Sequence, residues 1–383
     1  MRAIVALGLA SFASQALVRA ADTLLPQIAA DFAISVGAAS IVITAYALTH
    51  GSMQFITGPI ADRFGKFRTV AIACGLSAVT VAICGLAHSL DSLTLARFAS
   101  GITVAWILPI SLAYIGDVVP YEQRQQVLGR FLAGQVLGQL FGQAAGGIVG
   151  DYFGWRVMFL LLAAMLALAA IALGTELATN PITRVDRTAP RGLGPMASYK
   201  IVLRNPWARV MLLTVGLEGA LFQGVLPYVS ADLHLRFGLS FTLVGLIVGT
   251  FGIGGLIYAG TVQQLVGRFG QIGLATCGGL LVGLAYLVLA LAPAWWIAPA
   301  AVVAIGLGFY MLHNTLQTNA TQMAPERRGT AVTQFAASLF IGQSVGVALA
   351  ASVFDRVGAQ PAFVAAAVVL FGLGIWLGRR LKK

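Results

Sequence analysis

Charged residues are scarce in this sequence and account for only 10% of its 383 residues. A soluble protein carries roughly 25% charged residues, so the composition excludes an ordinary soluble core. The few charges are unbalanced, with 24 Lys and Arg against 13 Asp and Glu, and the formal net charge is +11. Such an excess could indicate nucleic-acid binding, but the basic residues lie between apolar runs and form no patch with aromatic residues. We therefore expect no nucleic-acid partner.

Cysteine and histidine are rare too, which bears on disulfides and metals. Cys74, Cys84 and Cys277 all lie inside apolar runs, so no disulfide framework is implied. These cysteines and the 4 scattered histidines lack the spacing of metal ligands. A phosphate-binding loop is absent from the sequence, which argues against transport driven by ATP. We expect no metal and no other cofactor.

Hydrophobic residues are abundant instead, at 58% of the chain, and they gather in twelve long runs. Each run is near the ~20 residues that a helix needs to cross the hydrocarbon of a bilayer. The runs are too long and too uniformly apolar to be barrel strands. The sequence therefore predicts an all-α membrane protein with twelve transmembrane helices. The predicted spans cover residues 3–25, 37–57, 69–88, 92–115, 128–150, 157–175, 209–230, 241–262, 272–292, 295–318, 330–353 and 361–378.

The Lys and Arg residues predict the orientation of these helices. If both termini are cytoplasmic, 19 of the 24 basic residues face the cytoplasm, and only Arg156, Arg236 and Arg356 face outward. Cytoplasmic loops of membrane proteins are rich in Lys and Arg. This split therefore favours a multi-pass protein of the plasma (bacterial inner) membrane with both termini inside.

Residues 176–208 form the only long polar stretch, with four prolines and most of the basic charge of the middle of the chain. We interpret this stretch as a cytoplasmic linker between two six-helix bundles, residues 1–175 and 209–383. A regulatory or partner-binding loop is the alternative interpretation.

The two predicted bundles are similar to each other in sequence. A shift of 204 residues gives seven agreements, one of them a dipeptide, in one register across a loop, a helix and the next loop. The matched pairs are Arg124 with Arg328, Phe131 with Phe335, Gly138-Gln139 with Gly342-Gln343, Gly142 with Gly346, Asp151 with Asp355, Gly154 with Gly358 and Phe159 with Phe363. Parallel repeats of this kind predict pseudo-symmetric bundles with a central site where they meet.

A short charged turn separates the second and third predicted helices. Its residues Gly58, Asp62, Arg63, Gly65 and Lys66 follow the pattern Gly-x-x-x-Asp-Arg-x-Gly-Lys. This pattern resembles the loop signature found between the second and third helices in the major facilitator superfamily. The resemblance implies a twelve-helix secondary transporter of a small molecule, in which charges at this seam make breakable gating contacts. A simple topology anchor is the alternative.

Two further motifs extend the resemblance. In the second bundle, Arg268 takes the place of Arg63 in a partial copy of the charged turn. In the fourth helix, Arg97-x-x-x-Gly101 resembles the family's fourth-helix motif, whose Arg is linked to proton transfer. An Arg inside a membrane costs roughly 2.5–3.5 kcal/mol, so it should face a partner or a wet cavity. Snorkelling of Arg97 to the outer interface is the alternative.

The fifth predicted helix is rich in glycine. Gly129, Gly138, Gly142, Gly146 and Gly147 fit the spacing that marks drug:proton antiporters within this superfamily. The resemblance implies export rather than import. Glycines four residues apart also form a flat strip that lets another helix approach closely, so generic small-residue packing is the alternative.

The same helix carries Gln135, Gln139 and Gln143 at four-residue spacing. Gln143 stands where the antiporter motif has a proline, so the kink of that motif is not expected here. Three amides on one face of a membrane helix should not face lipid. They either line the substrate path or form hydrogen bonds between helices.

Asp22 and Glu218 lie well inside the first and seventh predicted helices, which are equivalent in the two bundles. Arg19 precedes Asp22 by three residues, so the two share a helix face and can neutralise each other. Glu218 has no cation near it in sequence, so we expect it to be the more easily protonated acid. We expect Asp22 to balance charge or meet the substrate. Structural roles for both acids are the alternative.

His50, His313 and Asn314 complete the polar candidates for the substrate cavity. Each histidine stands alone, which is more typical of a hydrogen-bonded packing residue than of a proton carrier.

Together these features predict a proton-coupled exporter of small, largely apolar compounds that works by rocker-switch alternation of its two bundles in the lipid bilayer. An exporter or importer of a small polar metabolite, such as a sugar or an amino acid, is the first alternative. A membrane-embedded lipid-handling protein or enzyme is the second, although no nucleophile–base pair supports an enzyme.

Overall fold

The computed structural model describes residues 2–183, 195–324 and 328–382, and every regular element in these ranges is a helix. The helices before the predicted linker are α1 (Arg2–Asp31), α2 (Val36–Ala39), α3 (Ile41–Phe64), α4 (Lys66–Gly85), α5 (Leu90–Val104), α6 (Ile107–Val118), α7 (Tyr121–Phe153) and α8 (Trp155–Thr179). The later ones are α9 (Pro195–Arg204), α10 (Pro206–Glu218), α11 (Leu226–Phe237), α12 (Phe241–Gly249), α13 (Phe251–Leu291), α14 (Ala298–Ala320), α15 (Arg328–Val357) and α16 (Gln360–Arg380). Three short turns complete the set: η1 (Pro181–Thr183), η3 (Trp295–Ile297) and the π-helical η2 (Gly219–Gln223).

Ten segments of the described chain are long and apolar enough to cross a membrane, judged by length and composition. The longest, Phe241–Leu291, has 51 residues and contains Gly270, whose φ of 59° and ψ of −176° divide it into two membrane-length helices. The 33-residue, glutamine-containing α7 supplies the twelfth helix. The prediction of an all-α membrane protein with twelve helices is therefore confirmed within the described ranges.

Four predicted spans are interrupted where the sequence predicted continuous helices: the second at Ser40, the eighth at Thr250, and the fourth and seventh more extensively. The fourth is divided into α5 and α6, because Pro109 has no N–H to donate to the carbonyl of Ala105. Gln54 of α3 donates to that carbonyl instead, at 3.3 Å. The seventh is divided into α10 and α11 by η2, where the N–H of Gly224 bonds to the carbonyl of Gly219 at 2.9 Å.

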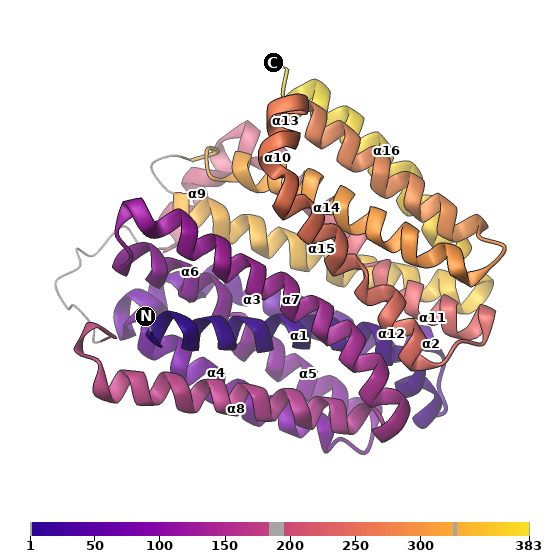
Figure 1. Cartoon of the computed structure of the whole chain (residues 1–383), viewed down its shortest axis with the longest axis horizontal. Coiled ribbons are helices and arrows are strands. Elements are labelled where there is room, and N and C mark those ends of the chain that lie inside the picture. The colour runs from indigo at the N-terminus through magenta and orange to yellow at the C-terminus, as the bar shows by residue number, and fades with distance from the viewer. Residues whose placement is uncertain (1, 184–194, 325–327, 383) are drawn as a thin grey trace.

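The long helices gather in two groups, α1 to α8 on one side of the molecule and α10 to α16 on the other (Figure 1). Within the first group α1 packs on α7 and α8, and within the second α13 packs on α14 and α16. Between the groups, α7 packs on α12, and α15 packs on α2 and α3. The helices α2, α11 and α12 lie at the end of the molecule away from the N-terminus (Figure 1).

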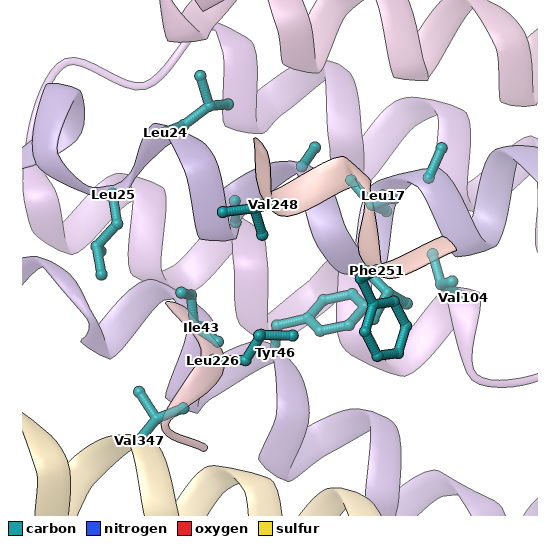
Figure 2. Packing of buried hydrophobic residues seen from close by; sticks show 14 of the residues in the cluster. Leu17, Leu24, Leu25, Ile43, Tyr46, Val104, Leu226, Val248, Phe251 and Val347 are labelled. Atoms are coloured by element: carbon teal, nitrogen blue, oxygen red, sulfur yellow. The ribbon is translucent and has the colours of Figure 1, made fainter. Parts of the chain in front are cut away.

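A buried apolar cluster crosses from one group to the other. Leu17 and Leu25 of α1 and Ile43 of α3 belong to it together with Leu226 of α11 and Val347 of α15 (Figure 2). All five side chains are buried. Between membrane helices such contacts stabilise by close packing, because lipid tails are as apolar as the side chains themselves.

The repeat in the sequence is also present in the packing. A Cβ on Gly142 would overlap the carbonyl of Ala16, and a Cβ on Gly346 would overlap the carbonyl of Ala220. Both pairs are related by the shift of 204 residues. The glycines that follow α7 and α15 have φ values of 85° and 84°, so the two helices also end in the same way.

Part of the predicted linker lies outside the described residues, including Arg184, Arg187 and Arg191 of the orientation argument. Arg327 and Lys383 lie outside them as well. The domain boundaries at residues 175 and 209 stay a prediction.

Within the linker, α9 contacts both helix groups. Tyr199 donates its hydroxyl to the carbonyl of Phe55 in α3, and the two ring centroids lie 5.6 Å apart. Gln334 of α15 donates to the carbonyl of Tyr199 at 3.5 Å. Burial raises the pKa of Tyr199, so its hydroxyl stays protonated and able to donate at neutral pH.

Candidate functional site

A buried polar cluster lies where α1 meets η2. Arg19 donates from Nη1 to Oδ2 of Asp22 at 3.3 Å and from Nη2 to Oε1 of Gln223 at 3.3 Å. Arg19 is 2% exposed and Asp22 is fully buried. The three-residue spacing thus brings Arg19 and Asp22 together, while Gln223 comes from the other helix group. Sequence reasoning missed Gln223, although it lies 204 residues after Arg19, which is the shift of the repeat.

Arg97 of α5 is fully buried beside this cluster. Its Nε donates to the carbonyl of Val42 at 3.2 Å, and its guanidinium lies 4.1 Å from the ring centroid of Tyr46. Its two Nη atoms have no hydrogen-bond partner among the described residues. An attractive electrostatic interaction links Arg97 to Asp22. Arg97 therefore faces the protein interior and does not extend to the membrane surface.

Glu218 and His313 form a second buried pair. Nδ1 of His313, on α14, lies 2.8 Å from Oε2 of Glu218 at the end of α10. Glu218 is fully buried, and the imidazole stacks on Phe309 at a centroid distance of 4.8 Å. The sequence did not predict this partner for His313, because the two residues lie 95 positions apart and only the packing of α10 near α14 joins them.

The two acids lie on equivalent helices but not at equivalent positions. The repeat shift of 204 relates Glu218 to Ser14, which is two helical turns before Asp22 on α1. No hydrogen bond or ion pair joins the two acid sites in the described part of the chain. Asp22 and Glu218 therefore lie in two separate buried sites.

The glutamines of α7 have different surroundings. Gln139 donates to Oε1 of Gln15 at 3.0 Å, which is a hydrogen bond between α7 and α1. Gln143 is fully buried, and neither atom of its amide has a partner within the described ranges. Gln135 is buried and its Nε2 is likewise unpartnered there. The interhelical alternative thus describes Gln139 only.

Gln343 of α15 is the repeat equivalent of Gln139, and sequence reasoning did not select it. The hydrogen-bond partner of Gln139 is Gln15, and the repeat equivalent of Gln15 in the second group is Gly219. A Cβ on Gly219 would overlap the carbonyl of Leu339. Oε1 of Gln343 is buried without a partner in the described chain. The repeat sequence is the signal that could have found it.

The remaining cavity candidates are packed against aromatic rings. His50 is buried between Tyr46, at a centroid distance of 5.4 Å, and Phe340 of α15, at 4.2 Å. It therefore lies at the contact between the two helix groups. Asn314 is partly buried, and its side chain lies near the hydroxyl of Tyr258.

Four of the five selected glycines lie at close helix contacts. A Cβ would meet the carbonyl of Phe12 at 2.5 Å from Gly138 and the hydroxyl of Thr23 at 2.5 Å from Gly146, both on α1. On Gly147 a Cβ would overlap the carbonyl of Phe241, which belongs to α12 in the other group. Around Gly129, by contrast, a Cβ would meet no described atom within 4 Å, so this glycine lies apart from the strip.

The charged turn has the geometry of a tight hairpin. Gly65 has a φ of 89° and separates α3 from α4, and Lys66 forms an ion pair with Asp117 of α6. Arg63 is exposed and lies over the ring of Phe64. The surroundings of Gly58 and the side chain of Asp62 lie outside the described part of the structure.

The partial copy in the second group has the same form. Arg268 is exposed and lies over the ring of Phe269, just before the left-handed Gly270. Neither Arg63 nor Arg268 has an ion-pair partner among the residues that the structure describes.

Known proteins share this chain's sequence pattern and fold. The Major Facilitator Superfamily profile matches residues 7–346 and 237–383. An uncharacterized MFS-type transporter of Bacillus subtilis (strain 168), YceJ, is 26% identical over 373 residues, which cover 94% of this chain and 91% of YceJ. MdtD of Escherichia coli (strain SE11), provisionally named a multidrug resistance protein, is 26% identical over 393 residues, covering 88% of this chain and 83% of MdtD.

The crystal structure of the nucleoside transporter NupG has the same fold, with a TM-score of 0.78, 15% sequence identity and 100% coverage of both chains. With the family match over nearly the whole sequence and twelve membrane helices in the described residues, the chain belongs to the Major Facilitator Superfamily and is a secondary transporter of a small molecule rather than an enzyme.

Proposed function

We propose that this transporter exports small, largely apolar compounds from the cytoplasm in exchange for protons. The observation that carries the proposal is the pair of buried acid sites, Asp22 with Arg19 and Glu218 with His313. An exporter driven by a proton gradient needs a group that binds a proton from one side and releases it to the other. Intramembrane acids are costly to bury and are functional by default.

Glu218 is the proposed proton carrier. Its carboxylate has one oxygen on His313 and the other, Oε1, without a partner in the described structure. His313 has 13% of its side chain exposed, against 1% for Glu218, so the imidazole is the more accessible member of the pair. Asp22 is the proposed charge-balancing or substrate-competed acid, because Arg19 neutralises it.

The proposed mechanism is rocker-switch alternation of residues 1–175 against residues 209–383, with both termini in the cytoplasm. The excess of Lys and Arg on the side of the termini supports this orientation. The name of MdtD and the glycine spacing of α7 both support efflux. Arg63, Lys66 and Arg268 are the proposed gating residues at the cytoplasmic seam, with Asp62 beside them in sequence.

A small polar metabolite is the second candidate substrate, and one observation favours it. Gln143 and Gln343 are buried near the contact between the helix groups and keep amide atoms without a described partner. Buried amides normally have hydrogen-bond partners, so a substrate with hydroxyl or carbonyl groups could supply them.

Transport into proteoliposomes under an imposed pH gradient tests the proposal. A panel of lipophilic cations, sugars, amino acids and nucleosides identifies the substrate class. For a transported compound, Glu218→Gln and Asp22→Asn should each lower uphill accumulation at least tenfold. Glu218→Gln should retain downhill exchange, and Glu176→Gln, a half-buried carboxyl at the end of α8, is the matched control. If both acid variants still concentrate substrate against its gradient, neither acid carries the proton.

A further inference from the structure

Two carboxylates form hydrogen bonds between the helix groups at the end of the molecule away from the N-terminus. Asp355, near the end of α15, accepts from the N–H of Gly37 at 2.8 Å and from the hydroxyl of Ser35 at 2.6 Å. Asp151, near the end of α7, accepts from the N–H of Thr242 at 3.1 Å. Each carboxylate therefore bonds to the first turn of a membrane span in the opposite group.

The two contacts are repeat equivalents. Asp151 and Asp355 differ by the repeat shift of 204, and the donors Gly37 and Thr242 differ by 205. Each donor lies two residues after a serine N-cap, Ser35 or Ser240, whose hydroxyl accepts from the N–H that follows the donor. The shift is 204 between α1 and η2, 205 at these donors, and 204 again between α7 and α15. The same type of contact therefore occurs once in each direction between the two helix groups.

The chemistry of these contacts favours a closed end. The first N–H groups of a helix have no partner within the helix, and a carboxylate satisfies them with a charge-assisted hydrogen bond. A Cβ on Gly37 would overlap Oδ2 of Asp355, so the glycine leaves the space that the carboxylate occupies.

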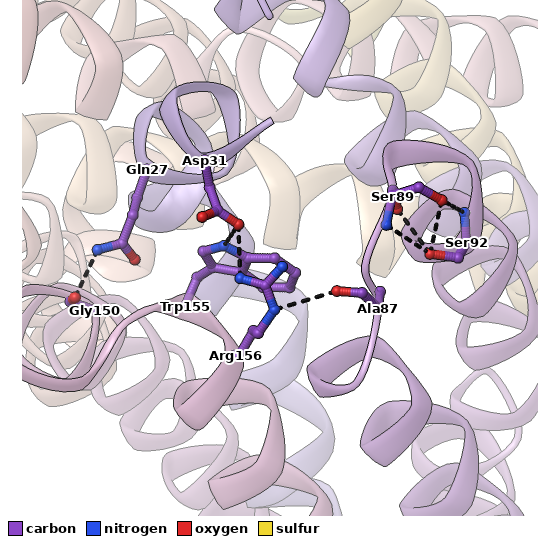
Figure 3. Close-up of polar contacts among 8 residues, drawn as sticks. All are labelled: Gln27, Asp31, Ala87, Ser89, Ser92, Gly150, Trp155 and Arg156. Carbon is purple, nitrogen blue, oxygen red and sulfur yellow. Dashed lines mark hydrogen bonds and ion pairs between the residues drawn. The ribbon is translucent and has the colours of Figure 1, made fainter. Parts of the chain in front are cut away.

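Contacts within the first group fix Asp151 to its own bundle (Figure 3). Gln27 of α1 donates to the carbonyl of Gly150 at 2.7 Å, directly before Asp151. Arg156 pairs with Asp31 at 2.6 Å, which joins the start of α8 to the end of α1. The carboxylate of Asp151 therefore moves with the first group, while Thr242 moves with the second.

We propose that Asp151 and Asp355 are paired gate residues that hold this end of the transporter closed. The inference rests on the proposed rocker-switch motion: separating the groups here must break both carboxylate contacts, and closing must remake them. The two acids act through backbone groups of the opposite bundle and touch no substrate, so they are positioning residues for the transport cycle. Because both carboxylates are exposed to solvent, each contact stabilises the closed state only modestly. The two contacts together multiply the equilibrium constant for closure.

Spin labels at His88 and Trp296, exposed positions at this end in opposite groups, measure the opening by pulsed electron resonance. The background replaces Cys74, Cys84 and Cys277 with Ser or Ala. Without substrate or pH gradient, Asp151→Asn and Asp355→Asn should each raise the long-distance population about threefold. The Ala variants should raise it further, and the double variant should exceed either single one. Asp91→Asn, an exposed carboxyl at the same end, is the control and should leave the distances unchanged.

The donor side gives an independent variant. Thr242→Pro removes the donating N–H at a position in the first helical turn, where proline is tolerated, and Thr242→Val keeps it. The proline variant should match Asp151→Ala in its distance distribution, and the valine variant should match the parent. Parent-like distances in the double Asp variant and in Thr242→Pro would overturn the gate. Because no substrate is present, this result is independent of whether protons drive export.

Discussion

At the scale of single residues, the buried acids Asp22 and Glu218 share one feature. Each has one carboxylate oxygen on a fixed partner and the other oxygen without a partner among the described residues: Oδ1 of Asp22 and Oε1 of Glu218. An unmade hydrogen bond of a buried charged group costs about 1–3 kcal/mol or more. A protein keeps a group at such a cost when the group has a function. These two oxygen atoms can exchange protons or contact the substrate.

His313→Gln tests the residue-scale account. A glutamine can donate to Oε2 of Glu218 but cannot carry a proton onward. We expect a melting-temperature change below about 4 °C, because the hydrogen bond is kept. Downhill exchange should stay within about twofold of the parent, whereas uphill transport driven by a pH gradient should fall about tenfold. A variant with parental uphill transport would show that the imidazole is only a packing partner.

The residue pairs also show what sequence spacing can predict. Arg19 and Asp22 could be paired in advance, because residues three apart share a helix face. Glu218 and His313 could not, because their contact depends on how α10 and α14 pack. Gln223 and Gln343 were accessible in principle, since the repeat shift maps them onto Arg19 and Gln139.

At the scale of helices, the lengths and order of the spans were predictable from apolar runs, whereas their breaks were not. Pro109 follows one break and Pro227 follows η2, but a count of apolar residues registers neither proline as a break. The glycine strip of α7 was found by spacing, yet its partner differs along its length. Gly142 contacts α1 of the same group, and Gly147 contacts α12 of the other. Which face of α7 meets which helix is set by tertiary packing.

Gly142→Leu should destabilise the first helix group. Its side chain would have to displace the backbone of Ala16, and overpacking of this kind typically costs about 1–3 kcal/mol, occasionally more. Thermal unfolding in detergent and transport in vesicles should both be impaired. Gly129→Leu is the matched control in the same helix, because a Cβ there meets no described atom within 4 Å, and it should behave as the parent. Equal stability of the two variants would contradict the assigned packing of α7 on α1.

At the scale of the whole molecule, the contacts between the helix groups lie where α7 meets α12 and where α15 meets α2 and α3. The carboxylate contacts of Asp151 and Asp355 add to them at the end away from the N-terminus. With the termini in the cytoplasm, this arrangement corresponds to a transporter closed toward the outside. The orientation itself is a prediction from the distribution of Lys and Arg.

Cysteine labelling tests that orientation. In a background without native cysteines, a cysteine at the exposed position Lys382 should react with an impermeant reagent only from the cytoplasmic side. A cysteine at the exposed position Asp91 should react only from outside. The reverse labelling pattern would show that the termini lie outside the cell. The closed end of the transporter would then face the cytoplasm.

The most direct test of proton-coupled export is proton movement driven by substrate alone. Proteoliposomes are loaded with a transported compound, diluted into substrate-free buffer of equal pH, and followed with a pH-sensitive dye in the lumen. The account predicts that substrate leaving the lumen drives protons into it, so that the lumen acidifies, and that Glu218→Gln abolishes the acidification while substrate still leaves. Substrate efflux by the parent without any change in luminal pH would contradict proton-coupled exchange.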